Sequence, residues 1–186
     1  MTLKGIPILE LQRLEKRFPL PRANFGGPRR EVKAVDSVDL TVYSGETVAL
    51  IGESGSGKTT LGRCAARLYP PTKGRILFKG LDITEKHGND LRSFRKSVQM
   101  VFQDPFASLN SIHTVYSHLS RSILIHRSLS NLSKRERKKA IEKEILSILN
   151  EVGLFPPENF IYKFPHEMSG GERQRISLAR ALIANP

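Results

Sequence analysis

A run of small, flexible and cationic residues at positions 52–60, Gly-Glu-Ser-Gly-Ser-Gly-Lys-Thr-Thr, has the composition needed to hold phosphate groups. Glycine lacks a Cβ, so a glycine-rich backbone can turn tightly and approach a ligand closely. A turn of this kind that opens into a helix presents several backbone N–H groups, and the positive end of the helix dipole, to an anion. The spacing Gly52-x-x-x-x-Gly57-Lys58-Thr59 therefore predicts a site for the phosphates of a nucleotide.

We call residues 52–60 the phosphate loop. Lys58 is expected to reach the β- and γ-phosphates, and the Thr59 hydroxyl to coordinate Mg²⁺. An ordinary glycine-rich turn with a capping threonine is the alternative, but the loop follows an apolar run and precedes a helical one, as the motif requires. The other residues expected to line the site are Gly52, Glu53, Ser54, Gly55, Ser56, Gly57 and Thr60.

The elements that must position this loop follow from hydrophobic periodicity and from turn residues. Apolar residues in alternation or in short runs predict strands at 8–18, 32–42, 47–52, 74–83 and 98–103. Helical spacing and capping signals predict helices at 58–68, 90–97, 133–152 and 172–184. Strands with helices between them predict an α/β sheet, and residues 104–165 form a helical insertion.

Two of these elements carry specific end signals. Ser133 and Glu136 have the spacing of a capping box, and Gly153 stands where a glycine ends a helix. The Pro-, Gly- and Arg-rich residues 19–31 are expected to form a loop, and residues 44–46 a turn.

A second glycine-rich turn, Met168-Ser169-Gly170-Gly171-Glu172, also opens a predicted helix. Ser169, Gly170 and Gly171 could form a second anion-binding nest at the helix N-terminus. The alternative is an ordinary N-cap, in which Ser169 accepts hydrogen bonds from the first N–H groups of the helix.

Taken together, the phosphate loop, a predicted strand ending in Gln103, a helical insertion and then Ser-Gly-Gly resemble the ATP-binding subunit of an ABC transporter. The resemblance runs from residue 8 to residue 186. It implies a P-loop NTPase core with an antiparallel β subdomain and an α-helical insertion subdomain, with the C-terminal part of the core missing. Residues 1–103 would form the core and β subdomain, 104–165 the helical subdomain, and 166–186 the signature motif and its helix.

The same resemblance implies roles for single residues. Two such subunits pair head to tail around two ATP molecules, each held with Mg²⁺. The signature turn, residues 169–171, would contact the γ-phosphate bound across the dimer. Gln103 would sense Mg²⁺ and the γ-phosphate and connect them to the helical subdomain. Phe18 would stack on the adenine, although Phe18 as a core residue, and Phe25 as the stacking residue, are alternatives.

Three segments narrow the resemblance to the oligopeptide/dipeptide importer group: ETVALIGESGSGKTTLGR, VQMVFQDPFASLN and FPHEMSGGERQRISLARAL. This implies a peripheral subunit on the cytoplasmic face of the cell membrane that couples ATP binding and hydrolysis to the uptake of peptides, nickel complexes or oligosaccharides. Its partners would be permease subunits, a second ATPase that is identical or paralogous, and, indirectly, an extracytoplasmic solute-binding protein. Glu172 replaces the usual glutamine of the signature, so its side chain is expected to point away from the phosphates.

Part of the catalytic apparatus is not found in the sequence. Phosphoryl transfer needs an acidic Mg²⁺ ligand at the end of an apolar strand, and the family follows it with a catalytic glutamate and a switch histidine. Asp104 is rejected for the first role because Pro105 follows it, and His166 for the last because it precedes the signature. We therefore expect a fragment of a longer ATPase that binds nucleotide weakly, without turnover, and is poorly soluble or partly molten.

The net charge of the chain is compatible with other partners and functions. A net charge of +12 predicts acidic partners such as nucleotide phosphates, nucleic acid or an anionic membrane. The run 134–139, KRERKK, would be a membrane contact or, as we favour, a solvated helix face. A soluble ABC ATPase acting on nucleic acid or ribosomes is one alternative function, and a non-hydrolysing remnant ending at Pro186 is another. One cassette, a single cysteine (Cys64, expected in the core) and no long heptad run argue against a nucleic-acid partner.

Overall fold

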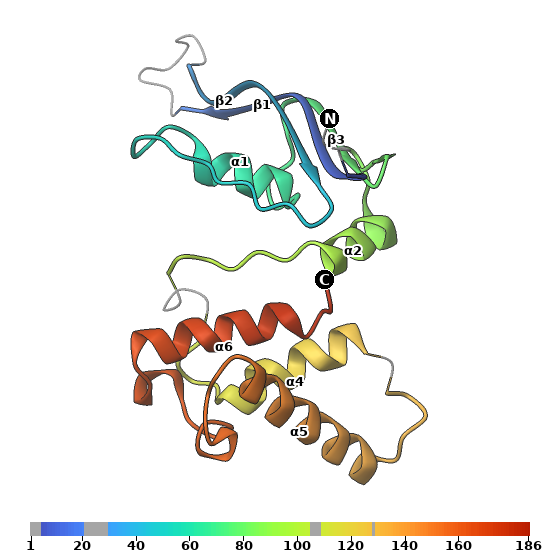
Figure 1. Cartoon of the computed structure of the whole chain (residues 1–186), viewed down its shortest axis with the longest axis vertical. Helices are drawn as coiled ribbons and strands as arrows, with labels where there is room; N and C mark the ends of the chain where they lie inside the picture. Colours follow the sequence, from blue (N-terminus) through green and yellow to red (C-terminus); the bar gives the residue numbers. More distant parts are fainter. Residues whose placement is uncertain (1–4, 21–29, 105–108, 128) are drawn as a thin grey trace, which may run out of the picture. The chain divides into compact units, whose positions relative to one another are not determined.

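The structure is a computed structural model that describes residues 5–20, 30–104, 109–127 and 129–186. The chain divides into two compact units, Met1–Arg95 and Lys96–Pro186 (Figure 1). Among the described residues, no helix combines the length and the apolar character needed to cross a bilayer.

The first unit is built on a four-stranded antiparallel sheet in the order β2-β1-β3-β4. Its strands are β1 (Pro7–Pro19), β2 (Glu31–Tyr43), β3 (Lys73–Phe78) and β4 (Leu81–Asp82). Leu11, Leu14, Val35 and Ile76 are buried. Strict alternation would put Leu11 and Leu14 on opposite faces, but the register shifts between them, where Arg13 has a φ of +45°. The strands predicted at 8–18 and 32–42 are confirmed.

The strand predicted at 74–83 is interrupted, because Lys79 and Gly80 form a turn between β3 and β4 with φ values of +51° and +77°. Helix α1 (Lys58–Ala65) packs on β1 and β2 and buries Leu61 and Cys64. It is three residues shorter than predicted, and Arg67 beyond its end has a φ of +51°. Helix α2 (Gly88–Ser97) follows, as predicted, and buries Phe94.

Two predicted strands are not formed, and this corrects the sequence prediction. Residues 47–52 and 98–103 have no strand structure. Ile51 is 94% exposed, and Val48, Leu50 and Val101 are also exposed. A strand buried on both faces needs a neighbouring strand to pair its backbone N–H and C=O groups. No strand in the described part of the chain pairs with either segment, so these four side chains remain exposed, while Val98, Met100 and Phe102 are half-buried.

The second unit is helical. It contains α4 (Val115–His126), α5 (Lys134–Glu151) and α6 (Gly170–Leu182), with the short 3₁₀ helices η1 (Pro157–Asn159) and η2 (Pro165–Glu167) (Figure 1). The helices predicted at 133–152 and 172–184 are confirmed, and α6 begins two residues earlier than predicted. The inward faces of these helices share one core, formed by Val115, Leu119, Ile123, Ile141, Ile145, Leu149, Ile176 and Ala179 among others.

The ends of these helices are satisfied by named groups. Ser133 and Glu136 form the predicted capping box, and Gly153 ends α5 with a φ of +75°. The N–H groups of Val115 and Tyr116, at the start of α4, donate to the carbonyls of Lys163 and Ile161 at 3.0 and 2.7 Å. The segment that precedes α6 therefore supplies the acceptors for the first turn of α4.

Arg175 on α6 ties this helix to the end of α5. Its Nη1 donates to the carbonyl oxygens of Val152 and Gly153 at 2.8 and 3.1 Å. We expect Arg175→Ala to lower the free energy of unfolding by about 1–3 kcal/mol, because charged hydrogen bonds to helix-terminal carbonyls are lost. Urea denaturation would measure the change. Arg135→Ala, which alters an exposed side chain on α5, is the control, and an equally large loss there would contradict the role of Arg175.

Candidate nucleotide-binding site

The phosphate loop lies at the N-terminus of α1 in the first unit, and glycine is required there. Gly55 and Gly57 have φ values of +82° and +91°, which L-amino acids with a Cβ rarely adopt. Gly57 is also the N-cap of α1, and a Cβ placed there would lie 2.1 Å from the carbonyl oxygen of Ala34 on β2. The loop can rest on β2 only because this position has no side chain.

The Lys58 side chain folds over the loop. Its Nζ donates to the carbonyl oxygens of Gly52 and Glu53 at 2.7 and 2.5 Å, and to Ser56 Oγ at 3.2 Å. The ammonium group is thus held inside the curve of the loop by the loop's own oxygens. No side chain caps the N-terminus of α1. The first backbone N–H groups of the helix, where its dipole is positive, can therefore donate to a ligand.

Two hollows border the loop on the side of β2. One of about 380 Å³ and one of about 450 Å³ share Ser56, Gly57 and Lys58 in their walls. The β2 residues Lys33 and Ala34 line both, and the Lys33 ammonium pairs with Asp36 at 2.9 Å. The sequence did not predict these β2 residues, because their place beside the loop depends on tertiary packing rather than on local pattern.

The hydrogen-bond donors of the loop fit a nucleoside triphosphate with Mg²⁺. A triphosphate needs several N–H donors and a cation, which the helix N-terminus and Lys58 offer. Thr59 is exposed in the first turn of α1, and its hydroxyl is the hard oxygen ligand that Mg²⁺ prefers. No cluster of three or more His, Cys, Asp or Glu residues that could hold a metal ion is found in the described residues.

Phe18, predicted to stack on the adenine, is partly buried on β1. Its ring meets the edge of Tyr69 at a centroid distance of 5.6 Å, and Lys16 Nζ lies 5.1 Å from the Phe18 centroid. Phe18 is paired across the sheet with Val32, which lines the smaller hollow beside the phosphate loop. The position of Phe18 opposite Val32 is compatible with stacking on adenine. Its contact with Tyr69 shows that Phe18 also packs against the protein. Phe25 lies outside the described residues.

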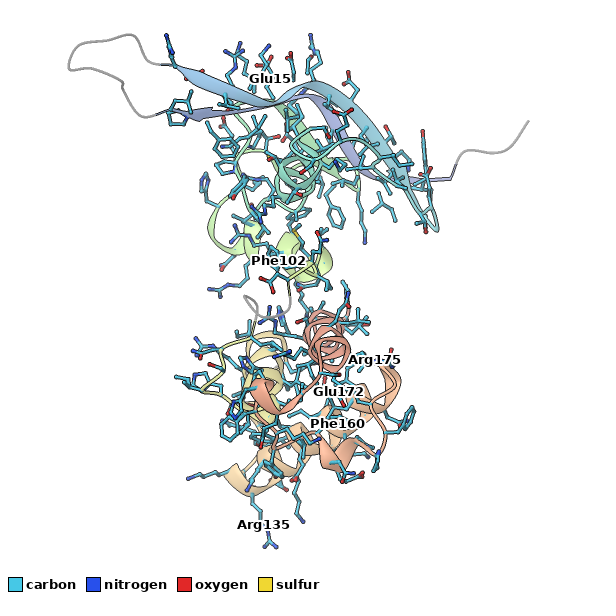
Figure 2. All side chains as sticks on the ribbon, turned by 90° about the vertical axis from the view of Figure 1, so that its left-hand side faces the viewer. Glu15, Phe102, Arg135, Phe160, Glu172 and Arg175 are labelled. Atoms are coloured by element: carbon cyan, nitrogen blue, oxygen red, sulfur yellow. The ribbon has the colours of Figure 1, made fainter. Side chains whose placement is uncertain are left out.

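The signature turn belongs to the second unit. Ser169 is the N-cap of α6, and its Oγ accepts from the Glu172 N–H at 3.3 Å, while Glu172 Oε2 accepts from the Ser169 N–H at 2.7 Å. Gly170 and Gly171 are exposed, with open space where a Cβ would stand. Glu172 (labelled in Figure 2) is therefore held back against the N-cap by this capping box. The structure places Ser169 as a cap, and anion binding at this turn remains a prediction.

This capping box has a pH signature. The hydrogen bonds from the Ser169 backbone and then from its side chain lower the pKa of Glu172 below the ordinary value of 4.5. A lowered pKa in the folded state stabilises the fold above pH 4.5, and this contribution is lost as the pH falls through the lowered pKa. We expect the melting temperatures of the wild type and Glu172→Gln to converge on acidification below pH 4.5. Parallel curves in a thermal-unfolding series across this range would contradict the prediction.

Gln103 is exposed, lies in the second unit, and is the last residue of the segment 98–103 that was wrongly predicted as a strand. Phe102, beside it, is labelled in Figure 2. The structure thus brings together residues 52–60 in one unit, whereas Gln103 and the turn 169–171 belong to the other.

Known proteins resemble the chain over nearly its whole length. A family model described as "ABC transporter" matches residues 35–186. The oligopeptide transport ATP-binding protein AppF of Bacillus subtilis (strain 168) is 47% identical over 180 residues, which are 96% of this chain and 52% of AppF. The glutathione import ATP-binding protein GsiA of Salmonella paratyphi A is 40% identical over 185 residues, which are 100% of this chain and 28% of GsiA.

A solved structure agrees with these matches. The dimeric, post-hydrolysis ATP-binding cassette MJ0796 bound to ADP and Pi has a TM-score of 0.76 and 26% identity, over 96% of this chain and 71% of that chain. The chain spans about half the length of AppF and a smaller share of GsiA. The resemblance inferred from the phosphate loop and the signature turn is confirmed, and the chain belongs to the ABC transporter family as part of an ATP-binding cassette.

Proposed function

We propose that this chain is the nucleotide-binding part of an ATPase subunit that couples ATP binding and hydrolysis to the import of peptides or related solutes. The observation that carries the proposal is the phosphate loop, in which Lys58 is held inside a glycine turn at an uncapped helix N-terminus. The relatives named above are transport and import proteins, which favours this function over action on nucleic acid or ribosomes.

The residues of the first unit have separate tasks in this proposal. The loop N–H groups and the N-terminus of α1 bind the phosphates, and Lys58 neutralises their charge. Thr59 supplies an oxygen to Mg²⁺, which withdraws charge from the phosphates when bound. Phe18 positions the adenine beside the hollow that Val32 lines.

The second unit supplies groups that act on the γ-phosphate. Gln103 is assigned to sensing Mg²⁺ and the γ-phosphate, and Ser169, Gly170 and Gly171 to contacting the γ-phosphate of a second subunit. Glu172 is compatible with this role because its carboxylate is engaged by the N-cap. The cassette would divide into a core with the β subdomain (residues 1–103), a helical subdomain (104–165) and the signature motif with its helix (166–186). Its partners would be permease subunits, which it would contact at the cytoplasmic face of the membrane. A solute-binding protein would act through those permeases.

The test is an assay of the complete transport system. The full-length protein is co-purified with candidate permease subunits, and its ATP hydrolysis is measured with and without Ser169→Arg, which places a bulky cation at the signature turn. The proposal expects co-purification and hydrolysis that this substitution reduces at least about tenfold, as for loss of one transition-state contact. Absence of both permease association and ATP hydrolysis would refute it.

A further inference from the structure

A concentration of positive charge lies where α4 ends and α5 begins. Residues 121–139, which we call the basic tip, contain seven Lys and Arg residues and one acidic residue, Glu136. This net charge of +6, seven minus one, is half of the +12 carried by all 186 residues. The tip therefore holds far more charge than its length would explain.

Most of the charges of the tip have no opposite charge beside them in the described residues, although Arg127 pairs with Glu144 at 3.1 Å. Four cations at the start of α5, Lys134, Arg135, Lys138 and Lys139, are exposed and form no ion pair among the described residues. Figure 2 shows Arg135 extending outward from its helix. The carboxylate of Glu136 is engaged elsewhere, because it accepts from the Ser133 N–H at 2.9 Å.

Stability of α5 does not account for this arrangement. Cations in the first turn of a helix oppose the positive end of its dipole. Lys134 with Lys138, and Arg135 with Lys139, are also like charges four residues apart, which repel each other on a helix surface. An anionic partner that lies against the tip would reverse both effects.

Exposed aliphatic side chains accompany these cations. Leu124 and Ile125, in the last turn of α4, are 51% and 63% exposed, although the preceding Ile123 is fully buried. Cations together with exposed Leu and Ile side chains are typical of surfaces that enter the headgroup region of an anionic bilayer. A nucleic acid would favour aromatic side chains for base stacking, and residues 121–139 contain no Phe, Tyr or Trp.

We propose that the basic tip binds an anionic phospholipid surface, with its cations on the headgroups and Leu124 and Ile125 at the boundary of the acyl chains. The proposal deepens the proposed function and rests on it, since an ATPase subunit of an importer works beside a membrane. The tip would add a lipid contact to those made with the permeases.

The test is vesicle flotation of the full-length protein with phosphatidylcholine vesicles, with and without phosphatidylglycerol. We expect binding only to the anionic vesicles, weakened by salt. The variant Arg135→Gln/Lys138→Gln/Lys139→Gln should bind about fivefold more weakly per charge, on the order of a hundredfold in all. The control is Lys73→Gln/Arg75→Gln/Arg92→Gln, which removes three exposed charges from the first unit and should retain binding within about twofold.

A second variant tests the apolar part of the tip. Leu124→Ser/Ile125→Ser should weaken vesicle binding and leave the salt dependence unchanged. Equal losses in the tip and control variants would overturn the proposal, because net charge alone would then explain binding. It would also be overturned if the tip variant lost affinity for a DNA or RNA oligonucleotide but not for vesicles. ATP binding, measured on the same samples, reports separately on the proposed function, since the tip variant should bind ATP normally.

Discussion

Replacing Lys58 by alanine is expected to weaken ATP binding on the order of a hundredfold. The ammonium lies inside the phosphate loop, 2.7 Å from the carbonyl of Gly52 and 3.2 Å from Ser56 Oγ. Hydrogen bonds to charged groups are worth about 1.5–3 kcal/mol each, and every factor of ten in affinity corresponds to about 1.4 kcal/mol. Equilibrium binding of a fluorescent ATP analogue would measure the loss.

The loss should be confined to binding. The loop carbonyls that Lys58 contacts are exposed, so water can replace the ammonium, and thermal stability should hardly change. Lys73→Ala, an exposed lysine in β3, removes the same charge from the same unit and should leave the affinity unchanged. An affinity that Lys58→Ala leaves intact would refute both the hydrolysing and the non-hydrolysing versions of a nucleotide-binding protein.

Gly57→Ala is also expected to lower both stability and ATP affinity strongly, because it disturbs the backbone of the phosphate loop and not its charge. The new Cβ would stand 2.1 Å from the Ala34 carbonyl oxygen, in a residue with a φ of +91°. The loop must then move off β2, so we expect a loss of about 3 kcal/mol in the free energy of unfolding together with most of the ATP affinity. Chemical denaturation and the same binding assay would follow both quantities.

The matched control is Gly45→Ala. Gly45 has a similar φ of +73°, but no atom lies within 4 Å of the position of its Cβ. This variant therefore separates backbone strain, about 1–2 kcal/mol, from steric overlap with β2. If the two variants lost equal stability and both kept ATP affinity, the contact between Gly57 and β2 would not be what holds the loop.

Local signals predicted much of the fold. The alternation in residues 32–42 identified β2, and the Ser133–Glu136 spacing identified the start of α5, because each depends on residues that are close in sequence. The phosphate loop was predictable for the same reason, since its glycines and Lys58 are required by the turn itself.

The failures arose where structure depends on distant neighbours. An apolar run such as 47–52 predicts a buried strand only if other strands pair with it, and in the described residues none does. The contact of Phe18 with Tyr69, and the place of Ala34 against Gly57, depend on how β1 and β2 meet α1. No local pattern encodes those contacts. The turn at Lys79 and Gly80 did have a local signal, a glycine inside a strand pattern.

Hydrogen bonds join the start of α4 to the segment before α6, and they affect local unfolding of the second unit. Val115 and Tyr116 donate to Lys163 and Ile161, which lie far along the chain and shortly before the signature turn. Their amide protons exchange with solvent when these hydrogen bonds break, so we expect the two stretches to open together. A fluctuation that displaces the signature turn would then also expose the amides at the start of α4.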